Sequence, residues 1–173
     1  RVVRAAGAIP GLARLRLSSI EVNHVKPALV DALRETPTAA RHLHVPLQSG
    51  DDRVLRDMGR RYDAATFLRR VDGLEDFNLT SDVIVGFPGE DEAAFRRTLA
   101  VVAEAGMSKV HVFPYSPRPG TVAATMDDQV PAEVVQERYE RLTALVEETT
   151  YAENQKQAGT AVEVLVAEGE GRK

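Results

Sequence analysis

The stretch from residue 82 to 90, Asp-Val-Ile-Val-Gly-Phe-Pro-Gly-Glu, constrains the fold of this chain more than any other. Residues 83–85 form a β-branched run, which is typical of a strand covered on both faces. The glycines and proline of residues 86–89 end the strand and turn the chain. Helical spacing of apolar residues follows from Glu92, after a cap at Glu90 or Asp91. In parallel α/β folds, ligands bind in the loop after such a strand.

The same strand–loop–helix pattern recurs along the chain at intervals of roughly 30 to 40 residues, the spacing of βαβ units. Strands are expected at residues 15–17, 42–47, 82–85 and 109–113, and helices at about 1–9, 26–34, 51–58, 63–71, 92–105 and 131–157. Four strands cannot close a barrel. The chain is therefore either a small open sheet or the second part of a larger barrel.

The two ends of the chain favour the second of these alternatives. The sequence begins without methionine, and a new alternating strand at 162–166 is cut off almost at once. We expect an α/β fold, namely a partial parallel (β/α) barrel containing the last four strand–helix units, over residues 1–158. Residues 159–173 would begin a second, truncated domain.

Composition narrows the function classes. The chain has no cysteine, so it has no disulfide, no thiolate nucleophile and no cysteine-ligated metal. No apolar run is long enough to span a membrane and no signal peptide is visible, which predicts a cytoplasmic protein without membrane contact. Residues 1–70 carry 13 Lys and Arg against 7 Asp and Glu, whereas residues 71–173 carry 9 against 19. The basic half could attract phosphate, or could simply be a solvated surface.

Polar residues gather where the predicted strands end. They are Ser18 and Ser19 after the first strand, Gln48 and Ser49 after the second, Gly86 and Glu90 after the third, and Tyr115 and Arg118 after the fourth. Because the carboxyl ends of parallel strands share one edge, this pattern is consistent with an active site. Turn residues of any α/β protein would explain it as well.

Two histidines raise the possibility of a metal site. His42 and His44 are two residues apart on one strand and so face the same side, to which His111 could also point. No further ligand is suggested nearby, which favours hydrogen-bonded histidines over a metal centre. No glycine-rich phosphate loop and no nucleophile elbow occurs in the sequence.

Five motifs in order carry a resemblance to a known family. They are RLSSIE (16–21), HLHVPLQSGDD (42–52), MGRRY (58–62), SDVIVGFPGE (81–90) and HVFPYSPRPGT (111–121). Together they resemble the methylthiotransferases of the radical S-adenosylmethionine superfamily over nearly the whole chain. SSIE, HLH and HVFPYS are most similar to the branch that modifies threonylcarbamoyladenosine in tRNA. Branches acting on isopentenyladenosine or on a ribosomal protein are the alternatives.

The resemblance implies a three-part enzyme with two 4Fe–4S clusters, a radical barrel and a small RNA-binding β-barrel that would begin near Thr160. The three cluster cysteines of the barrel would lie upstream of Arg1, so this segment should hold no cluster and should be inactive alone. The implied chemistry adds a methylthio group to C2 of a hypermodified adenosine in tRNA, using S-adenosylmethionine.

The resemblance also assigns roles to residues. The implied cofactor contacts are Ser18, Ser19, Gln48, Ser49, Ile84, Gly86, Glu90 and Phe113, and the implied tRNA contacts are Arg60, Arg61, Tyr115 and Arg118. Two other classes stay open. A non-redox (β/α) barrel lyase would need a lysine at a strand's carboxyl end, but Lys109 stands at a strand start. A non-catalytic RNA-binding module would need interleaved aromatic residues, which the chain lacks.

Overall fold

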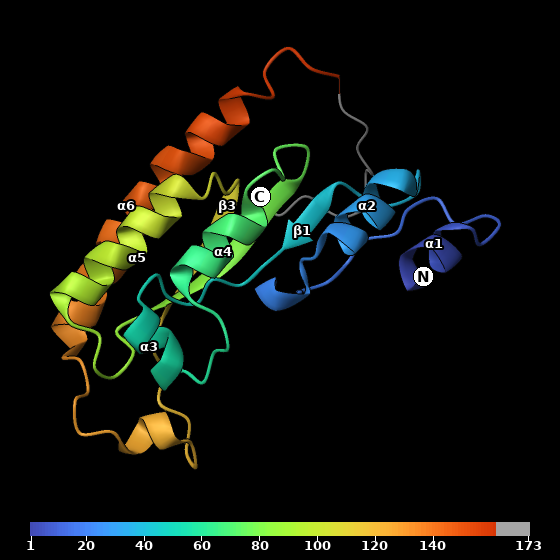
Figure 1. Ribbon diagram of the computed structural model, residues 1–173. Coiled ribbons are helices and arrows are strands. Elements are labelled where there is room, and N and C mark those ends of the chain that lie inside the picture. Colours follow the sequence, from blue (N-terminus) through green and yellow to red (C-terminus); the bar gives the residue numbers. More distant parts are fainter. Residues whose placement is uncertain (162–173) are drawn as a thin grey trace, which may run out of the picture.

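The computed structural model describes residues 1–161, and its centre is a parallel sheet (Figure 1). The sheet of this region has three strands in the order β1-β2-β3: β1 (His42–His44), β2 (Asn78–Val85) and β3 (Lys109–Pro114). The helices are α1 (Val2–Gly7), α2 (Pro27–Glu35), α3 (Asp52–Asp57), α4 (Ala64–Val71), α5 (Glu92–Glu104) and α6 (Ala132–Gln155), with short 3-10 turns η1 (Val22–His24) and η2 (Val122–Thr125). The α/β class is confirmed.

The first predicted strand, at residues 15–17, is wrong as a regular strand. Leu15 and Ser19 form isolated parallel bridges to Ala39 and His44, and the residues between them make no ladder. The segment is therefore an extended edge that touches the sheet at two points. The second predicted strand is also shorter than expected, since regular pairing ends at His44. The four extended segments nevertheless run parallel and side by side.

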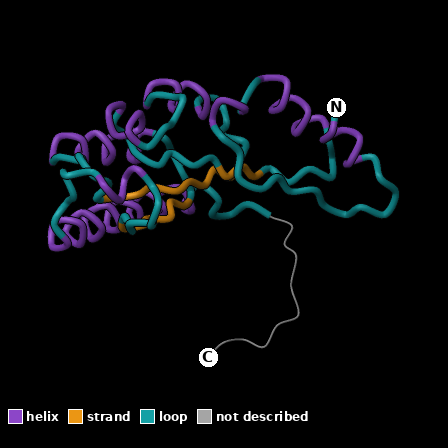
Figure 2. Tube along the Cα trace, turned by 90° about the horizontal axis from the view of Figure 1, so that it is seen from below, coloured by secondary structure: helices purple, strands orange, loops and turns teal. Residues whose placement is uncertain are grey.

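The two faces of the sheet differ in what covers them. Along β2, Leu79, Ser81, Val83 and Val85 are buried, whereas the alternate residues Thr80, Asp82 and Ile84 are half-buried. The first set packs against helices, and most helices lie to one side of the strands (Figure 2). The expectation of a strand covered on both faces is thus wrong within residues 1–161. The second face is polar and partly open.

Local capping explains where the helices begin. The carboxylates of Asp51, Asp63 and Asp91 accept hydrogen bonds from the first amides of α3, α4 and α5, which otherwise have no partner. Asp91, rather than Glu90, is therefore the cap of α5. Pro131 precedes α6 at the N-cap position, so its missing N–H costs nothing.

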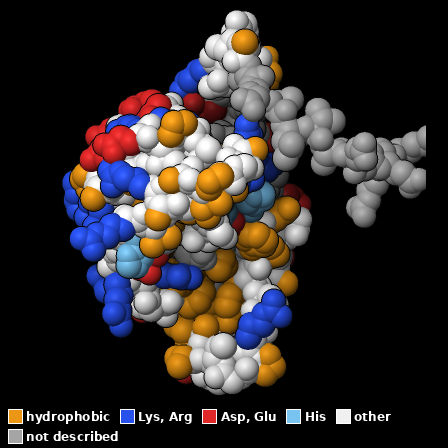
Figure 3. Space-filling model, turned by 90° about the vertical axis from the view of Figure 1, so that its right-hand side faces the viewer, with side chains coloured by type: hydrophobic (Ala, Val, Ile, Leu, Met, Phe, Trp, Pro, Cys, Tyr) orange, Lys and Arg blue, Asp and Glu red, His pale blue; other side chains and the backbone are white. Residues whose placement is uncertain are grey.

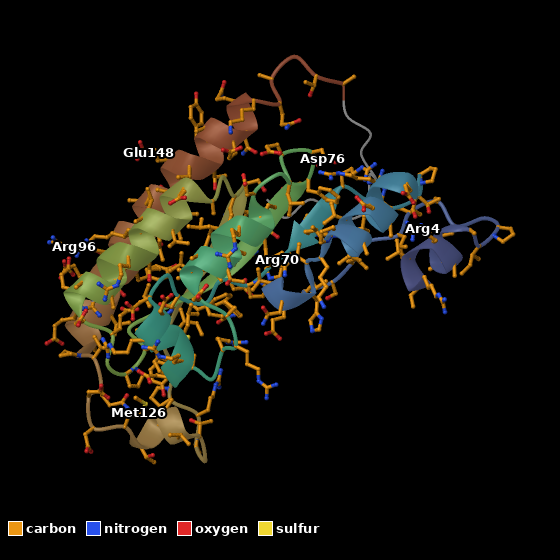
Figure 4. All side chains as sticks on the ribbon, in the orientation of Figure 1. Arg4, Arg70, Asp76, Arg96, Met126 and Glu148 are labelled. Carbon is orange, nitrogen blue, oxygen red and sulfur yellow. The ribbon has the colours of Figure 1, made fainter. Side chains whose placement is uncertain are left out.

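A long helix and a second small cluster complete the fold. α6 lies alongside α5 and packs on β3 (Figure 1). Beyond the carboxyl edge, Val54 and Phe87 pack with Met126, which lies beside η2 (Figure 4). None of the helices within residues 1–161 has the length and apolar character needed to cross a bilayer. The predicted strand at 162–166, and with it the second domain, lies outside the described residues.

Candidate functional site

Three of the predicted cofactor contacts lie in a row at the carboxyl edge of the sheet. The backbone amide of Gln48 donates to the Asp82 carbonyl (2.8 Å), and the backbone carbonyl of Gln48 accepts from the Ile84 amide (2.9 Å). Ile84 in turn pairs with Phe113 on β3. Gln48 and Phe113 are 65 positions apart in the chain, and Ile84 lies between them in the sheet. The strand pattern in the sequence predicted this convergence.

Gln48 has an unusual conformation for its residue type. Its φ is 67°, and it is the only non-glycine residue with a positive φ within residues 1–161. A left-handed backbone at such a residue costs about 1 kcal/mol or more. Gln48 is only 9% exposed, yet its side-chain amide makes no hydrogen bond to other described residues. Its side-chain amide atoms are not among the fully buried unpaired atoms of residues 1–161, so they remain accessible. A strained residue with an accessible, unused amide is typical of a ligand-binding position.

The loop after β2 leaves the same edge through tightly packed glycines. Gly86 has a φ of 75°, and a Cβ atom built there would lie 2.4 Å from Val135 Cγ2 on α6. Its amide donates to Glu90 Oε1 (3.0 Å). At Gly89, the amide donates to the Asp128 carbonyl, and the carbonyl accepts from the Arg53 guanidinium (2.6 Å). The loop is therefore held from several elements at once.

The structure assigns Glu90 a place inside the protein rather than on the open edge. Its side chain has no exposed surface and is paired with Arg138 on α6, 2.9 Å away. Burial raises the pKa of the Glu90 carboxyl, while the Gly86 amide and Arg138 act in the opposite direction. A carboxylate enclosed in this way is not placed to contact a cofactor directly. It shapes the loop instead.

Ser49 also turns away from the edge. Its hydroxyl lies 3.3 Å from Thr98 Oγ1 on α5 and accepts from the Asp51 amide, and the residue is fully buried. Because its hydroxyl is used inside the protein, Ser49 is not available to a ligand at the edge. Of Gln48 and Ser49, only Gln48 is placed to face such a ligand.

Ser18 and Ser19 lie at a different level. Ser19 pairs with His44, four residues before Gln48, which corresponds to roughly 13 Å along a strand. Both serines are exposed and line a hollow of about 460 Å³ on the open face of the sheet, together with Arg16, Leu17, His42, His44, Thr80 and His111. They do not join the row formed by Gln48, Ile84 and Phe113.

The hollow contains a hydrogen-bonded histidine network. The two ring nitrogens of His44 lie 2.9 Å from Thr80 Oγ1 and 3.1 Å from Asp82 Oδ2, and the His111 ring is 6.2 Å away. Burial, together with the nearby Arg16, lowers the pKa of His42. Within residues 1–161 no group of three or more potential ligands could hold a metal ion. Hydrogen bonding, the alternative favoured from the sequence, describes these histidines.

The predicted tRNA contacts are spread over two regions. Arg60 and Arg61 are exposed in the connection between α3 and α4, whereas Arg118 is exposed in the loop after β3. Tyr115 instead packs edge-to-face on Phe87, with 5.4 Å between the ring centroids. Lys and Arg side chains gather along one edge of the face seen in Figure 3, with apolar side chains in its lower part. These residues do not form a single cluster.

Sequence reasoning missed Arg138, the buried partner of Glu90. A signal was present, because Arg138 lies four residues after Val134 and four before Leu142. That spacing puts it inside the apolar stripe of α6, where a charged residue needs a buried partner.

Comparison with protein families identifies the fold. Residues 3–102 match the model of the radical SAM superfamily. The chain belongs to this superfamily. Membership implies S-adenosylmethionine and 4Fe–4S chemistry, although this chain, having no cysteine, supplies no thiolate for a cluster.

Curated relatives match this radical SAM chain along its full length. It is 52% identical over 177 aligned positions to the tRNA-2-methylthio-N(6)-dimethylallyladenosine synthase of Kineococcus radiotolerans, and 51% identical to that of Salinispora arenicola. Each alignment covers all of this chain and 35% of the relative. The chain thus spans about a third of the length of these relatives. Their names correspond to the isopentenyladenosine alternative and give no support to the threonylcarbamoyladenosine branch.

A solved structure shows the same fold. Coproporphyrinogen III oxidase from Escherichia coli, described as a radical SAM enzyme, aligns with a TM-score of 0.66 over 79% of this chain and 32% of its own. At 20% sequence identity, the likeness concerns the fold alone.

Proposed function

We propose that this chain is part of the radical barrel of a tRNA methylthiotransferase that acts on dimethylallyladenosine, the isopentenyl-modified base. The observation that carries the proposal is identity at about half of all positions, along the entire chain, to tRNA-2-methylthio-N(6)-dimethylallyladenosine synthases from several bacteria. The family match and the fold support the cofactor class. The cysteine-free chain would contribute the cofactor-facing edge, and the clusters would be held elsewhere in the full-length protein.

The row at the carboxyl edge fits S-adenosylmethionine. The unpaired side-chain amide of Gln48 would bind a polar group of the ribose or methionine, and Ile84 would pack on the adenine. Phe113, which is 49% exposed, offers a ring edge and backbone beside it. Gly86 would act indirectly, by turning the chain after Ile84, because Val135 of α6 fills the space beside its Cα. When bound, the cofactor supplies the adenosyl radical and the methyl group. The chain's task is to hold the nucleoside in place and to keep water away from it.

The arginines outside the row would serve the tRNA. Arg60, Arg61 and Arg118 are exposed and carry the positive charge that a phosphate backbone attracts. Because they lie in separate loops, they would contact separate phosphates rather than form one pocket. Ser18 and Ser19, in the hollow beside His44, are better placed for the substrate than for the cofactor.

The test is to express the full-length protein in a bacterium that lacks its own methylthiotransferases and to analyse tRNA nucleosides by mass spectrometry. The expected product is 2-methylthio-dimethylallyladenosine. If 2-methylthio-threonylcarbamoyladenosine appears instead, the family holds and the substrate is wrong. If no methylthio nucleoside forms while the clusters are loaded, the proposed function is refuted.

A further inference from the structure

We propose that Arg138 of α6 is a positioning residue that holds the loop of residues 86–90 in the shape needed to receive the cofactor, acting through Glu90. The inference deepens the proposed function and rests on it, because the loop matters only if a ligand binds at that edge. Arg138 itself is expected to touch neither the cofactor nor the tRNA.

A short chain of hydrogen bonds connects Arg138 to the buried turn that follows Ile84 at the end of β2. Arg138 Nη1 donates to the Glu90 carbonyl (2.8 Å) and to Glu90 Oε1 (2.9 Å). The same Oε1 accepts from the Gly86 amide (3.0 Å). The guanidinium therefore fixes both the backbone and the side chain of Glu90, and Glu90 fixes the amide of Gly86. No part of this chain of contacts reaches the surface.

Burial makes these contacts depend on one another. The side chains of Arg138 and Glu90 are 6% and 0% exposed. Arg138 Nε and Glu90 Oε2 have no hydrogen-bond partner within residues 1–161, so the pair is not saturated by other groups. The guanidinium carbon lies 5.6 Å from the centre of the Phe95 ring, which holds the side chain from α5. Removing one partner would leave the other buried and unpaired, so Glu90 would have to move.

The loop gives such a movement a direct route to the site. Gly86 follows Val85, the last residue of β2, and Ile84 lies in the row with Gln48 and Phe113. If Glu90 turns away, the Gly86 amide loses its acceptor, and the left-handed turn at that glycine loses its closure. The end of β2, which carries Ile84, is then free to shift.

The same pair of helices supplies a matched control. Arg141, one turn further along α6, bonds Glu92 of α5 at 2.9 Å, but both side chains are well exposed and neither contacts the loop. A second control is Val146, which is buried in α6 at 4% exposure, two turns beyond Arg138. The first control tests the ion pair as such, and the second tests a general loss of helix packing.

The experiment measures the affinity of the full-length protein for S-adenosylhomocysteine, which cannot be cleaved, by equilibrium dialysis. Arg138→Gln should weaken binding about tenfold or more, Arg138→Lys should recover part of the loss, and Arg141→Gln should bind as the wild type does. Val146→Ala, chosen for a comparable loss of melting temperature, should retain its affinity. Amide exchange of the peptide spanning residues 83–91 should accelerate in Arg138→Gln only.

The outcomes separate the two proposals. Unchanged affinity in Arg138→Gln, or an equal loss in Val146→Ala, overturns the positioning role. If Arg138→Gln does not fold, the comparison of Arg138→Lys with wild type decides the same question. If the wild-type protein with loaded clusters fails to bind the probe, the proposed function fails instead. Amide exchange then reports by itself whether Arg138 holds the loop.

Discussion

Replacing Gly86 with alanine is expected to destabilise the fold by about 2 to 4 kcal/mol. Part of this is the left-handed backbone, since φ is 75° and a Cβ atom there costs about 1 kcal/mol. The rest is crowding. The new methyl would lie 2.4 Å from Val135 Cγ2 and 3.0 Å from Cγ1, and overpacking of this kind typically costs about 1 to 3 kcal/mol.

Two further variants separate these contributions. Gly59 has nearly the same φ, 72°, but nothing lies within 4 Å of a Cβ built there. Gly59→Ala should therefore show the backbone cost alone, about 1 kcal/mol. Val135→Ala combined with Gly86→Ala should remove the two closest contacts and leave only Cβ of residue 135, at 3.1 Å. The double variant should then be more stable than the sum of the two single changes by about 1 to 2 kcal/mol.

The assay is urea unfolding followed by circular dichroism, with the free energy of unfolding extrapolated to water. All variants should unfold with similar slopes, so that the midpoints report stability. If Gly86→Ala loses no more than Gly59→Ala, or if Val135→Ala brings no relief, then contact between the loop and α6 does not determine this turn.

Three further predictions follow from the site and from α5. Gln48→Gly should leave stability unchanged or raise it by up to about 1 kcal/mol in urea unfolding, because it relieves the left-handed strain, while it weakens S-adenosylhomocysteine binding in equilibrium dialysis. Phe113→Ala should change unfolding by less than about 1 kcal/mol, because the ring is half exposed, but should weaken the same binding. Hydrogen bonds from Arg141 and Arg96 lower the pKa of Glu92 from 4.5 to about 2. The contribution of Glu92 to the free energy of unfolding is therefore present above pH 4.5 and is lost as the pH falls towards 2. In acid titration, the free energy of unfolding of Glu92→Gln should fall less steeply than that of the wild type, and high salt should reduce this difference.

The helices were predictable because the signals that start and stop them are local. Asp51, Asp63 and Asp91 each stand just before an apolar periodic segment, and each caps a helix; for α5 the sequence left Glu90 and Asp91 open. The outward residues behave as ordinary surface, as Arg96 on α5 and Glu148 on α6 show by pointing away from the sheet (Figure 4). Propensity and spacing were enough for these elements because they needed no information from distant residues.

The strands and the site were less predictable because pairing is not local. The alternation at residues 15–17 is typical of a strand, but whether a ladder forms depends on the register with residues 39–44, which only the fold determines. Ser49 and Glu90 were expected at the site because they follow strands, and the resemblance assigned them to the cofactor. Which way a side chain turns at a strand end depends on partners elsewhere in the chain, here Thr98 and Arg138.

The predicted positions Gln48 and Gly86 and the missed position Arg138 belong to one arrangement. Gln48 and Gly86 both have left-handed backbones and both lie where an extended segment ends at the carboxyl edge. Neither conformation is favoured by the residues around it, so each must be maintained from outside. Gln48 is fixed through its backbone, which bonds β2 on both sides, at Asp82 and Ile84. Gly86 is held by Glu90, and Glu90 is held by Arg138 of α6. Buried contacts therefore determine the backbone conformation of the open edge. Sequence patterns at the edge do not predict these contacts, because their partners lie elsewhere in the chain.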